Sequence, residues 1–408
     1  MKRFAPWIVA ALLFARPAMA QVKIALIETM SGPFANIGAA AQAHFQTAAE
    51  RINASGGVLG GQKIEIVTFD GKGSPQESLI ALKAAVDQGI RFVTQGNSSA
   101  VAAALIDGIN KHNERNPDRT VLYLNYSAVD PDLTNSKCSF WHFRFDANSD
   151  QKMGALTDYL KDQKSLKAVY IIGQDYAHGH QVARAAESML KQKRPDVRIV
   201  GNDLHPIGKV KDFAPYIAKI QASGADAVLT GNWGNDVTLL VKAAADAGLK
   251  APFYTYYGGG YGVAPALGEL GVGRVVQITE WHLNLGTGPS ESFLREFHQK
   301  YKPIDWYYGR VNTTMYMLAK AVQAAHSTDP KKVALALEGM HYEGDGGEVW
   351  MRKEDHQLIQ PLYISTYAKV DGKSVKIGSE DTQYSFKTDA RIDGRVTELP
   401  TTCQMKRP

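Results

Sequence analysis

Cysteine is almost absent from this sequence, since Cys138 and Cys403 are the only two in 408 residues. Neither has a Cys or His at a spacing typical of zinc ligands, so the sequence predicts no structural metal site. In an exported protein an even number of cysteines predicts a disulfide, which here would join the last residues of the chain to its first third. Two free thiols are the alternative, because spacing alone does not determine pairing.

An excess of charge of one sign is also absent, because 46 Lys and Arg accompany 41 Asp and Glu for a net charge of +5. A nearly neutral chain offers no electrostatic basis for binding nucleic acid. Long apolar runs are missing after residue 20, so no later segment is predicted to cross a bilayer core about 30 Å thick.

Catalytic signatures are scarce as well. The sequence has no G-x-S-x-G elbow, no Walker loop, no H-E-x-x-H and no G-x-G-x-x-G after its first predicted strand. His178 and His180 form an H-x-H, but their loop supplies no set of carboxylates, so a solvated turn is expected there. We therefore predict no catalytic residue, no cofactor and no bound metal, and hence a protein that is not an enzyme.

The first residues are typical of an export signal. Lys2 and Arg3 precede an apolar run that ends near Phe14, and an Ala-Met-Ala triplet offers small residues for cleavage. The run is too short to span a membrane, and Gln21 stands where a lipid-modified protein would have cysteine. We predict a cleaved signal peptide over residues 1–20 and a periplasmic location, with a short buried helix or membrane anchor as the alternative.

Beyond the signal, apolar strands alternate with amphipathic helices, a pattern that builds parallel sheets covered by helices on both faces. The remaining chain is too long for one hydrophobic core, so two lobes are expected. Strands are predicted at residues 22–27, 64–69, 91–94, 120–125, 168–172, 197–201 and 227–231, and helices at 38–53, 74–88, 99–113, 181–192, 213–223, 237–247, 290–301, 311–325 and 330–339.

The predicted fold class is α/β, with two Rossmann-like lobes joined by a three-stranded hinge. Crossovers are expected near residues 143–148, 278–284 and 346–361. They define an N-terminal lobe of residues 21–143 plus 280–345 and a C-terminal lobe of residues 144–279 plus 346–408.

Two loops of the predicted first lobe carry the side chains expected to hold an anion. Asn97, Ser98 and Ser99 lie where a strand leads into a helix, so backbone N–H groups, hydroxyls and the helix dipole favour a carboxylate. A plain serine N-cap is the alternative. The next loop is expected to line the same cleft with Ser127, Ala128 and Val129. Its alternative is an ordinary turn that contains proline.

Aromatic residues gather in the loops of the predicted second lobe. Tyr176 is expected to reach across the cleft, and Trp233 and Tyr257 lie beside glycines in loops suited to stacking on a flat ligand. Because aromatic side chains more often fill a core, a core position is the alternative for each of them.

Several short motifs occur in a recognisable order through residues 22–350. They are Lys23-Ile24-Ala25 before Ser31-Gly32-Pro33, Ile52–Val58 followed by Gly60, Asp130–Thr134, Asp175-Tyr176, Lys211-Asp212-Phe213 and Ala247-Gly248-Leu249. This order resembles the periplasmic binding proteins of branched-chain amino acid uptake, of the Leu/Ile/Val type. The resemblance implies a type I periplasmic binding protein fold, which closes like a hinge on its solute and is then recognised by an ABC permease.

The resemblance also assigns contact residues. The family's serine-rich carboxylate loop falls on Asn97–Ser99, its next contact loop on Ser127–Val129, its cross-cleft tyrosine on Tyr176, and its second-lobe aromatic residue on or near Trp233.

Two positions depart from the family pattern. Val129 stands where the amino acid binders have threonine, and Tyr257 stands where they have a glutamate that pairs with the ligand's ammonium group. An ammonium group buried without a carboxylate partner costs several kcal/mol. Asp175 or Asp236 would be substitutes, but a carboxylate ligand with no ammonium group and an aromatic or other hydrophobic body is the simpler prediction.

The sequence therefore predicts the periplasmic solute-binding component of an ABC importer, which binds an amino acid or an aromatic or aliphatic carboxylate. The expected partners are this ligand and an inner-membrane permease; nucleic acid is not expected, and the protein is expected to be a monomer. A ligand-sensing receptor subunit is one alternative, although no signalling segment follows. A secreted α/β hydrolase or oxidoreductase is another, although the sequence shows no nucleophile–base pair or cofactor loop.

Overall fold

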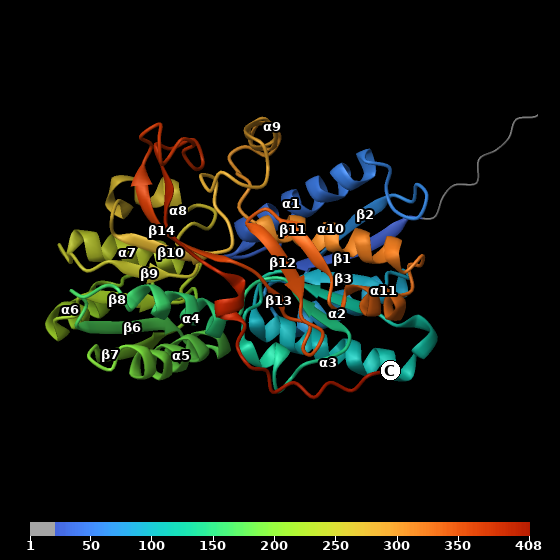
Figure 1. The fold of residues 1–408 in the computed structure, drawn as a ribbon, viewed down its shortest axis with the longest axis horizontal. Helices are drawn as coiled ribbons and strands as arrows, with labels where there is room; N and C mark the ends of the chain where they lie inside the picture. Colours follow the sequence, from blue (N-terminus) through green and yellow to red (C-terminus); the bar gives the residue numbers. More distant parts are fainter. Residues whose placement is uncertain (1–20) are drawn as a thin grey trace, which may run out of the picture.

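The computed structural model describes residues 21–408, which form two α/β lobes side by side (Figure 1). The predicted signal peptide over residues 1–20 lies outside the described residues. Within the part of the chain that is described, no helix is long and apolar enough to cross a membrane.

The first lobe is built on a parallel five-stranded sheet in the order β2-β1-β3-β4-β5. Its strands are β1 (Val22–Glu28), β2 (Ile64–Asp70), β3 (Phe92–Gln95), β4 (Leu122–Asn125) and β5 (His142–Arg144). Its helices are α1 (Ala35–Ala54), α2 (Pro75–Asp87), α3 (Ser99–Arg115), α10 (Gly309–Ala324) and α11 (Pro330–Leu337), with short 3₁₀ turns η1 (Pro117–Arg119) and η2 (Pro131–Thr134). A small antiparallel sheet joins β11 (His341–Gly344), β12 (Gly347–Met351) and β13 (Leu358–Ile359).

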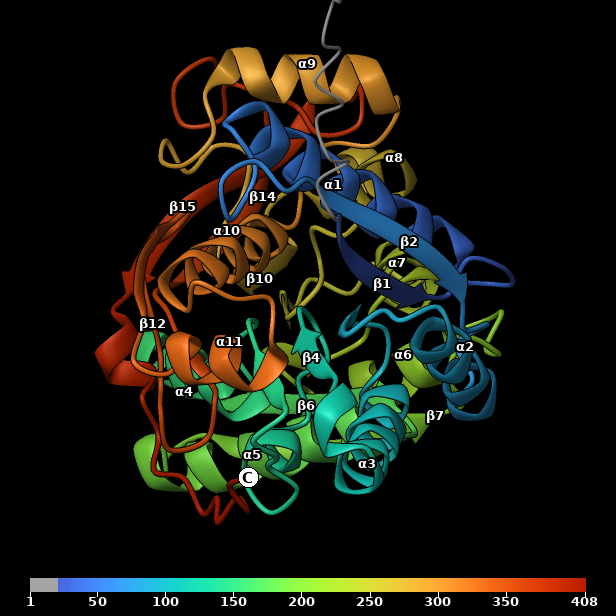
Figure 2. The same cartoon turned by 90° about the vertical axis from the view of Figure 1, so that its right-hand side faces the viewer.

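The second lobe is built on a seven-stranded sheet in the order β15-β14-β10-β9-β8-β6-β7. Its strands are β6 (Ala168–Gln174), β7 (Arg198–His205), β8 (Ala227–Thr230), β9 (Phe253–Thr255), β10 (Val275–Thr279), β14 (Leu362–Lys369) and β15 (Tyr384–Ile392). The last two pair antiparallel, and the others are parallel. The helices are α4 (Ser149–Leu160), α5 (Ala177–Lys193), α6 (Ala214–Ser223), α7 (Asn235–Asp246) and α8 (Val263–Leu267), with 3₁₀ turns η3 (Gly268–Gly271) and η4 (Gly394–Thr397). Figure 2 shows β14 and β15 curving along one side of the molecule.

Each lobe has its own hydrophobic core. One large cluster fills both faces of the first sheet, and two clusters lie on the two faces of the second. Strand β6 is buried at all seven positions, as expected for a central strand with helices on both faces. Helix α9 (Glu291–Tyr301) packs Leu294 and Phe297 against α1 through Ala43.

Helix starts follow local capping chemistry. Ser74 accepts a hydrogen bond from the Glu77 amide at the start of α2, where Pro75 holds the first helical position. Asn148 and Gln151 form a reciprocal capping box at the start of α4, a helix that the sequence analysis did not predict. Its apolar pattern is weak because buried polar residues such as Thr157 interrupt it.

The third crossover differs from the boundary expected at residue 346. Strands β12 and β13 belong to the first lobe, because Val349, Met351 and Leu358 pack in its core. The chain passes to the second sheet only at residues 360–361, directly before β14. The exposed–buried alternation of β12 would suit a strand that packs on the core of either lobe. The sequence pattern alone therefore does not show to which lobe β12 belongs.

The last residues also differ from their predicted place in the C-terminal lobe. Cys403 forms a disulfide with Cys138 of the first lobe. The Asn135 side chain accepts a hydrogen bond from the Thr402 amide at 3.0 Å, and Met405 packs against the first-lobe core. The tail therefore makes a fourth passage between the lobes, after η4.

The crossing strands are bound to one another by Arg144, which is fully buried at the end of β5. Its Nε donates to Gln357 Oε1 at 2.6 Å and its guanidinium also donates to the Asp130 carbonyl at 2.5 Å and to the Thr134 hydroxyl. Gln357 in turn donates to the Asp146 carbonyl at 2.9 Å. These bonds join the first and third crossovers into one hinge.

Candidate ligand-binding site

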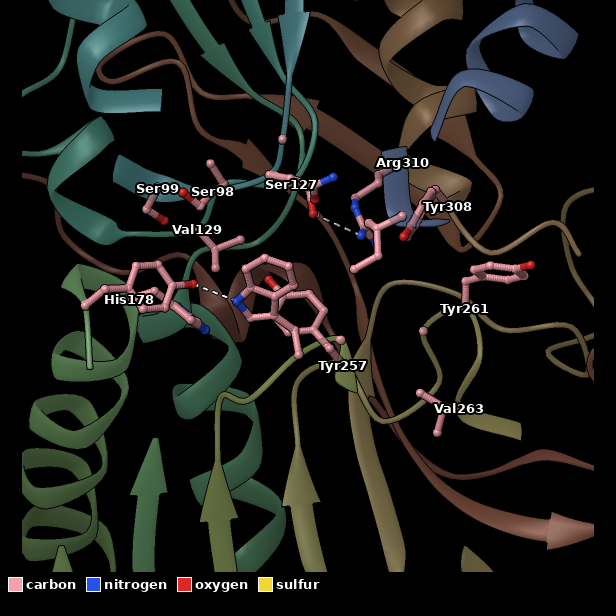
Figure 3. A pocket seen from close by; sticks show the side chains of 18 residues that line it. Ser98, Ser99, Ser127, Val129, His178, Tyr257, Tyr261, Val263, Tyr308 and Arg310 are labelled. Atoms are coloured by element: carbon pink, nitrogen blue, oxygen red, sulfur yellow. Dashed lines mark hydrogen bonds between the residues drawn. The ribbon is translucent and has the colours of Figure 1, made fainter. Parts of the chain in front are cut away.

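A pocket lies between the two lobes, at the carboxyl ends of the strands of both sheets (Figure 3). The empty space in it is about 610 Å³, part of which is open to solvent. All nine residues predicted to contact ligand line it: Asn97, Ser98, Ser99, Ser127, Ala128, Val129, Tyr176, Trp233 and Tyr257. Other residues that line it were not predicted as ligand contacts, among them Ile37, Tyr261, Val263, Tyr308 and Arg310.

The first-lobe wall of the pocket, which we call the polar wall, begins at the start of α3. Ser98 is the N-cap residue, but its hydroxyl makes no capping hydrogen bond, so the plain N-cap alternative does not describe it. Ser99 accepts a hydrogen bond from the Asp130 amide at 3.2 Å, which leaves its own hydroxyl hydrogen free to donate. The first amides of α3 have no partner within the helix. The wall thus presents donors and the positive end of a helix dipole.

Glu28, which the sequence analysis missed, organises the loop behind this wall. Its carboxylate accepts hydrogen bonds from the Gly96 amide at 2.7 Å, the Asn97 side chain at 2.7 Å and the Tyr126 hydroxyl at 2.8 Å. The predicted loop therefore offers fewer free donors than expected, because Gly96 and Asn97 already bond to Glu28. Burial raises the pKa of Glu28 to about 7, although these hydrogen bonds act to lower it.

The second loop of the polar wall is shaped by Asn125 at the end of β4. Its Oδ1 accepts from the Ser127 and Ala128 amides at 3.1 and 2.7 Å, and its Nδ2 donates to the Ala128 carbonyl at 2.9 Å. The Val129 carbonyl accepts from the Ser149 amide at 3.0 Å. The loop is thus held at both ends, against its own strand and against the first turn of α4.

The second-lobe wall, which we call the aromatic wall, carries Tyr176, Trp233 and Tyr257. Trp233 Nε1 donates to the Tyr176 hydroxyl at 2.8 Å, so that the tyrosine's own hydrogen is free to donate elsewhere. Phe34 of the first lobe packs against Trp233 with ring centroids 4.4 Å apart. This contact across the cleft brings the lobes together over the pocket.

Among the described residues that line the pocket, the charged one is Arg310, at the start of α10. One guanidinium nitrogen donates to Glu280 at 2.7 Å and another to the Ser127 hydroxyl at 3.1 Å, the latter drawn in Figure 3. Asp146 lies 3.6 Å from Arg310 Nε and 2.9 Å from Lys152. The cluster pairs two cations with two carboxylates and ties α10 to the first and second crossovers.

Burial opposes ionisation throughout this cluster. Desolvation acts to raise the pKa of Glu280, but the adjacent Arg310 guanidinium outweighs it and holds the pKa below its usual value. Desolvation likewise acts to lower the pKa of Arg310, and the charges of Glu280 and Asp146 raise it above its usual value instead. Arg310 therefore stays charged. No local motif marked it in the sequence, because its partners come from segments far apart in the chain.

His178 corrects one sequence-based expectation. It is buried and lines the pocket, whereas only His180 faces solvent, so the H-x-H is not a solvated turn. Burial lowers the pKa of His178 to about 4, which leaves the ring neutral near pH 7. Its Nε2 lies 3.1 Å from the Gly231 carbonyl and must therefore carry the hydrogen. Among residues 21–408, no group of His, Cys, Asp and Glu is arranged to hold a metal ion.

The two acidic substitutes considered for an ammonium partner do not line the pocket. Asp175 is exposed and contacts His180 at 2.9 Å. Asp236 is buried, but its carboxylate already accepts from Gln174 at 2.8 Å and from the Gly208 amide at 2.9 Å. Among the described residues that line the pocket, none is acidic.

Comparisons with known proteins agree with this architecture. A family model described as periplasmic binding protein matches residues 21–373. The chain is 34% identical over 399 residues to Leu/Ile/Val-binding protein homolog 4 of Brucella abortus, covering 95% of this chain and 93% of that protein.

Solved structures share the fold. The leucine-, isoleucine-, valine-, threonine- and alanine-binding protein of Brucella ovis, in a closed conformation, has a TM-score of 0.84 at 32% identity, over 95% of this chain and all of that one. A solute-binding protein from Rhodopseudomonas palustris, in complex with p-hydroxybenzoic acid, has a TM-score of 0.76 at 21% identity, over 92% and 98%. The second likeness concerns the fold alone.

The interlobe pocket, the double α/β fold and these matches agree, and the chain belongs to the periplasmic binding protein family, a class of solute-binding proteins and not of enzymes.

Proposed function

We propose that this periplasmic binding protein carries a small organic carboxylate that has an aromatic or other apolar body and no ammonium group. The polar wall binds the carboxylate, and the aromatic wall covers the body as the lobes close. Closure shifts an existing balance between open and closed forms, because the ligand contacts both lobes only in the closed form.

The observation that carries this proposal is the pocket's charge. Arg310 is its cation, donors of Ser98, Ser99 and Ser127 surround the start of α3, and the lining residues within 21–408 include no carboxylate. Tyr257 occupies the position where an ammonium partner is expected, and its ring lies 5.2 Å from the Lys152 ammonium, which is itself a cation. A ligand ammonium there would be desolvated with no carboxylate among the described lining residues to pair with it.

A branched-chain amino acid is the second candidate. It is favoured by the name of the Brucella abortus relative and by the ligands in the name of the Brucella ovis structure. The p-hydroxybenzoic acid complex, by contrast, exemplifies the first candidate on the same fold. The chemistry of the lining, more than the ligand of any one relative, supports the carboxylate without an amine.

Delivery to an inner-membrane ABC permease follows from the family. We further propose that residues 1–20 direct export, that the protein acts as a monomer and that it binds no nucleic acid. The almost even balance of 46 basic and 41 acidic residues supports the last point.

Calorimetric titration tests the proposal with benzoate, 4-hydroxybenzoate, leucine, isoleucine and benzylamine. We expect the two benzoates to bind and to stabilise the protein, by about 2.7 kcal/mol at one hundred times the dissociation constant. Benzylamine, which has the ring without the carboxylate, should not bind. Tight binding of leucine with no response to either benzoate would overturn the proposal in favour of the amino acid.

A further inference from the structure

A second cavity lies directly behind the ligand pocket, towards the hinge. It encloses about 500 Å³, part of it open to solvent. Tyr257, Gly260, Tyr308 and Arg310 border both cavities. The two spaces are therefore separated by the thickness of a few side chains. The site described above takes up only the first of them.

Gly260 stands at the shared border without any conformational need for glycine. Its φ angle lies outside the left-handed region, and a Cβ built there would have the Tyr257 carbonyl oxygen, at 3.5 Å, as its nearest neighbour. The preceding Gly259 differs, because a Cβ there would collide with Gln277 Oε1 and lie 2.9 Å from the Phe386 ring. Fold geometry thus explains Gly259 but not Gly260. At Gly260 the missing side chain leaves space between the cavities.

The far cavity has aromatic sides and includes two side chains, Gln277 and Tyr307, whose polar groups bond to no other described residue. Trp281, Trp306 and Phe386 supply rings, which suit a flat apolar body. Gln277, on β10, is only 4% exposed, and among residues 21–408 its side-chain amide makes no hydrogen bond. Two other polar side chains of the lining have partners: His282 contacts the Thr388 hydroxyl at 2.9 Å, and Ser385 contacts Ser379 at 2.9 Å.

The Gln277 amide lines the cavity and bonds to no other described residue, so it is available to a ligand group placed there. Gln277 has both a donor and an acceptor, and therefore matches a hydroxyl, which also has both. The carboxylate-binding donors of Ser98 and Ser127 lie in the other cavity. A single ligand that satisfies both ends must reach from the polar wall, past Gly260, to β10.

We propose that the two cavities form one elongated site, whose ligand is an aryl-alkanoic or aryl-alkenoic acid with a hydroxyl at the end remote from the carboxylate. The carboxylate lies at the start of α3, the chain passes between Tyr257 and Tyr308, and the ring hydroxyl bonds to Gln277. This inference rests on the proposed function, because it places the carboxylate in the same position, and it adds the length and the far polar end of the ligand.

Four acids test the length and the hydroxyl separately: benzoate, 4-hydroxybenzoate, 3-phenylpropenoate and 3-(4-hydroxyphenyl)propenoate. By calorimetry, the wild-type protein should bind the last of these about tenfold or more tighter than benzoate. Gly260→Leu should weaken the binding of the two propenoates about tenfold more than that of the two benzoates, because the new side chain fills the space between the two cavities. Gly260→Ala is the matched control and should have a much smaller differential effect, since there is room for one methyl group.

Gln277→Met tests the far end with little change in side-chain length. It should reduce the preference for the hydroxylated over the plain propenoate from about fivefold to none. Thermal unfolding of each variant shows that the fold is kept, and the ratio between two ligands on one protein is independent of the fraction folded. Equal effects of Gly260→Leu on short and long acids, or a hydroxyl preference that survives Gln277→Met, would overturn the elongated site. If wild-type protein binds none of the four acids, the proposed function fails as well, and that result is seen before any variant is made.

Discussion

The two walls of the ligand pocket differ in how their side chains are held. On the polar wall, the loops after β3 and β4 are fixed by hydrogen bonds within the first lobe, from Glu28 and from Asn125. On the aromatic wall, the side chains of Trp233 and Tyr176 bond to each other, and the Trp233 ring packs against Phe34. The side chains of the polar wall are thus held mainly by directional hydrogen bonds, and those of the aromatic wall mainly by contact between ring surfaces.

This difference matters for specificity. Hydrogen bonds to fixed donors require a carboxylate at one place and in one orientation, whereas apolar contact tolerates changes of shape. We infer that the polar wall decides the ligand's functional group and that the aromatic wall decides its size and flatness. Arg310 stands where the walls meet, since it contacts Ser127 on one side and the crossover residue Glu280 on the other.

The largest effect is expected where the walls are joined. Arg310→Met leaves Glu280 buried without its cation and should lower the free energy of unfolding by about 3–5 kcal/mol. Urea unfolding followed by fluorescence measures this loss. The double variant Arg310→Met/Glu280→Gln should recover part of it, because the unpaired charge is gone. A single variant as stable as wild type would contradict the role of the cluster.

The aromatic wall should give the next largest effect, on binding and not on folding. Trp233→Ala removes the ring that contacts Phe34 and should weaken the binding of an aromatic carboxylate by about 2 kcal/mol. Trp350→Ala is a matched control, since Trp350 lies on β12 and stacks on His341 instead of lining the pocket. Calorimetric titration with 4-hydroxybenzoate compares them. Equal losses in both variants would mean that the wall is misassigned.

On the polar wall a smaller loss is expected, but one that is the same for every carboxylate. Ser98→Ala deletes one hydroxyl donor and should cost about 1 kcal/mol of binding free energy for short, long, aromatic and aliphatic acids alike. Ser55→Ala, an exposed hydroxyl at the end of α1, provides the control. A loss confined to aromatic ligands would contradict the division between the two walls.

A change of pH is expected to have the smallest net effect on the free energy of unfolding. The reason is that Glu28, behind the polar wall, and His178, in the second lobe, respond to pH in opposite directions. Burial raises the pKa of Glu28 from 4.5 to about 7, so its contribution to stability is complete below pH 4.5 and is lost as the pH rises through 7. Burial lowers the pKa of His178 from 6.5 to about 4, so its contribution is present above pH 6.5 and is lost as the pH falls through 4.

Single variants separate these two contributions. The free energy of unfolding of Glu28→Gln, relative to wild type, should increase as the pH rises from 5 to 8. That of His178→Gln, relative to wild type, should increase as the pH falls from 7 to 4. Urea unfolding at intervals of pH measures both. Parallel curves for wild type and variant would show that the residue does not titrate in that range.

Much of the fold followed from pattern alone. Helices such as α2 and α3 have an apolar stripe and a clear start, and their predicted bounds lie within two residues of the observed ones. The boundary at residue 346 was wrong because β12 has an alternation that suits either sheet, and its place depends on Val349 and Met351 meeting the first-lobe core. His178 was assigned to a solvated turn for a similar reason, since a motif of two histidines does not reveal which one is buried.

The sequence by itself determined the alternation of strands and helices and the loops that end the strands. It also determined which loops carry hydroxyls and which carry rings, because these properties depend on residues near one another in the chain. Only the tertiary structure decided that Glu28 bonds to Gly96 and Asn97, that Arg310 pairs with Glu280 and Asp146, and that Gly260 borders two cavities. Those contacts join segments tens to hundreds of residues apart, and only the packing of both lobes around the hinge fixes them.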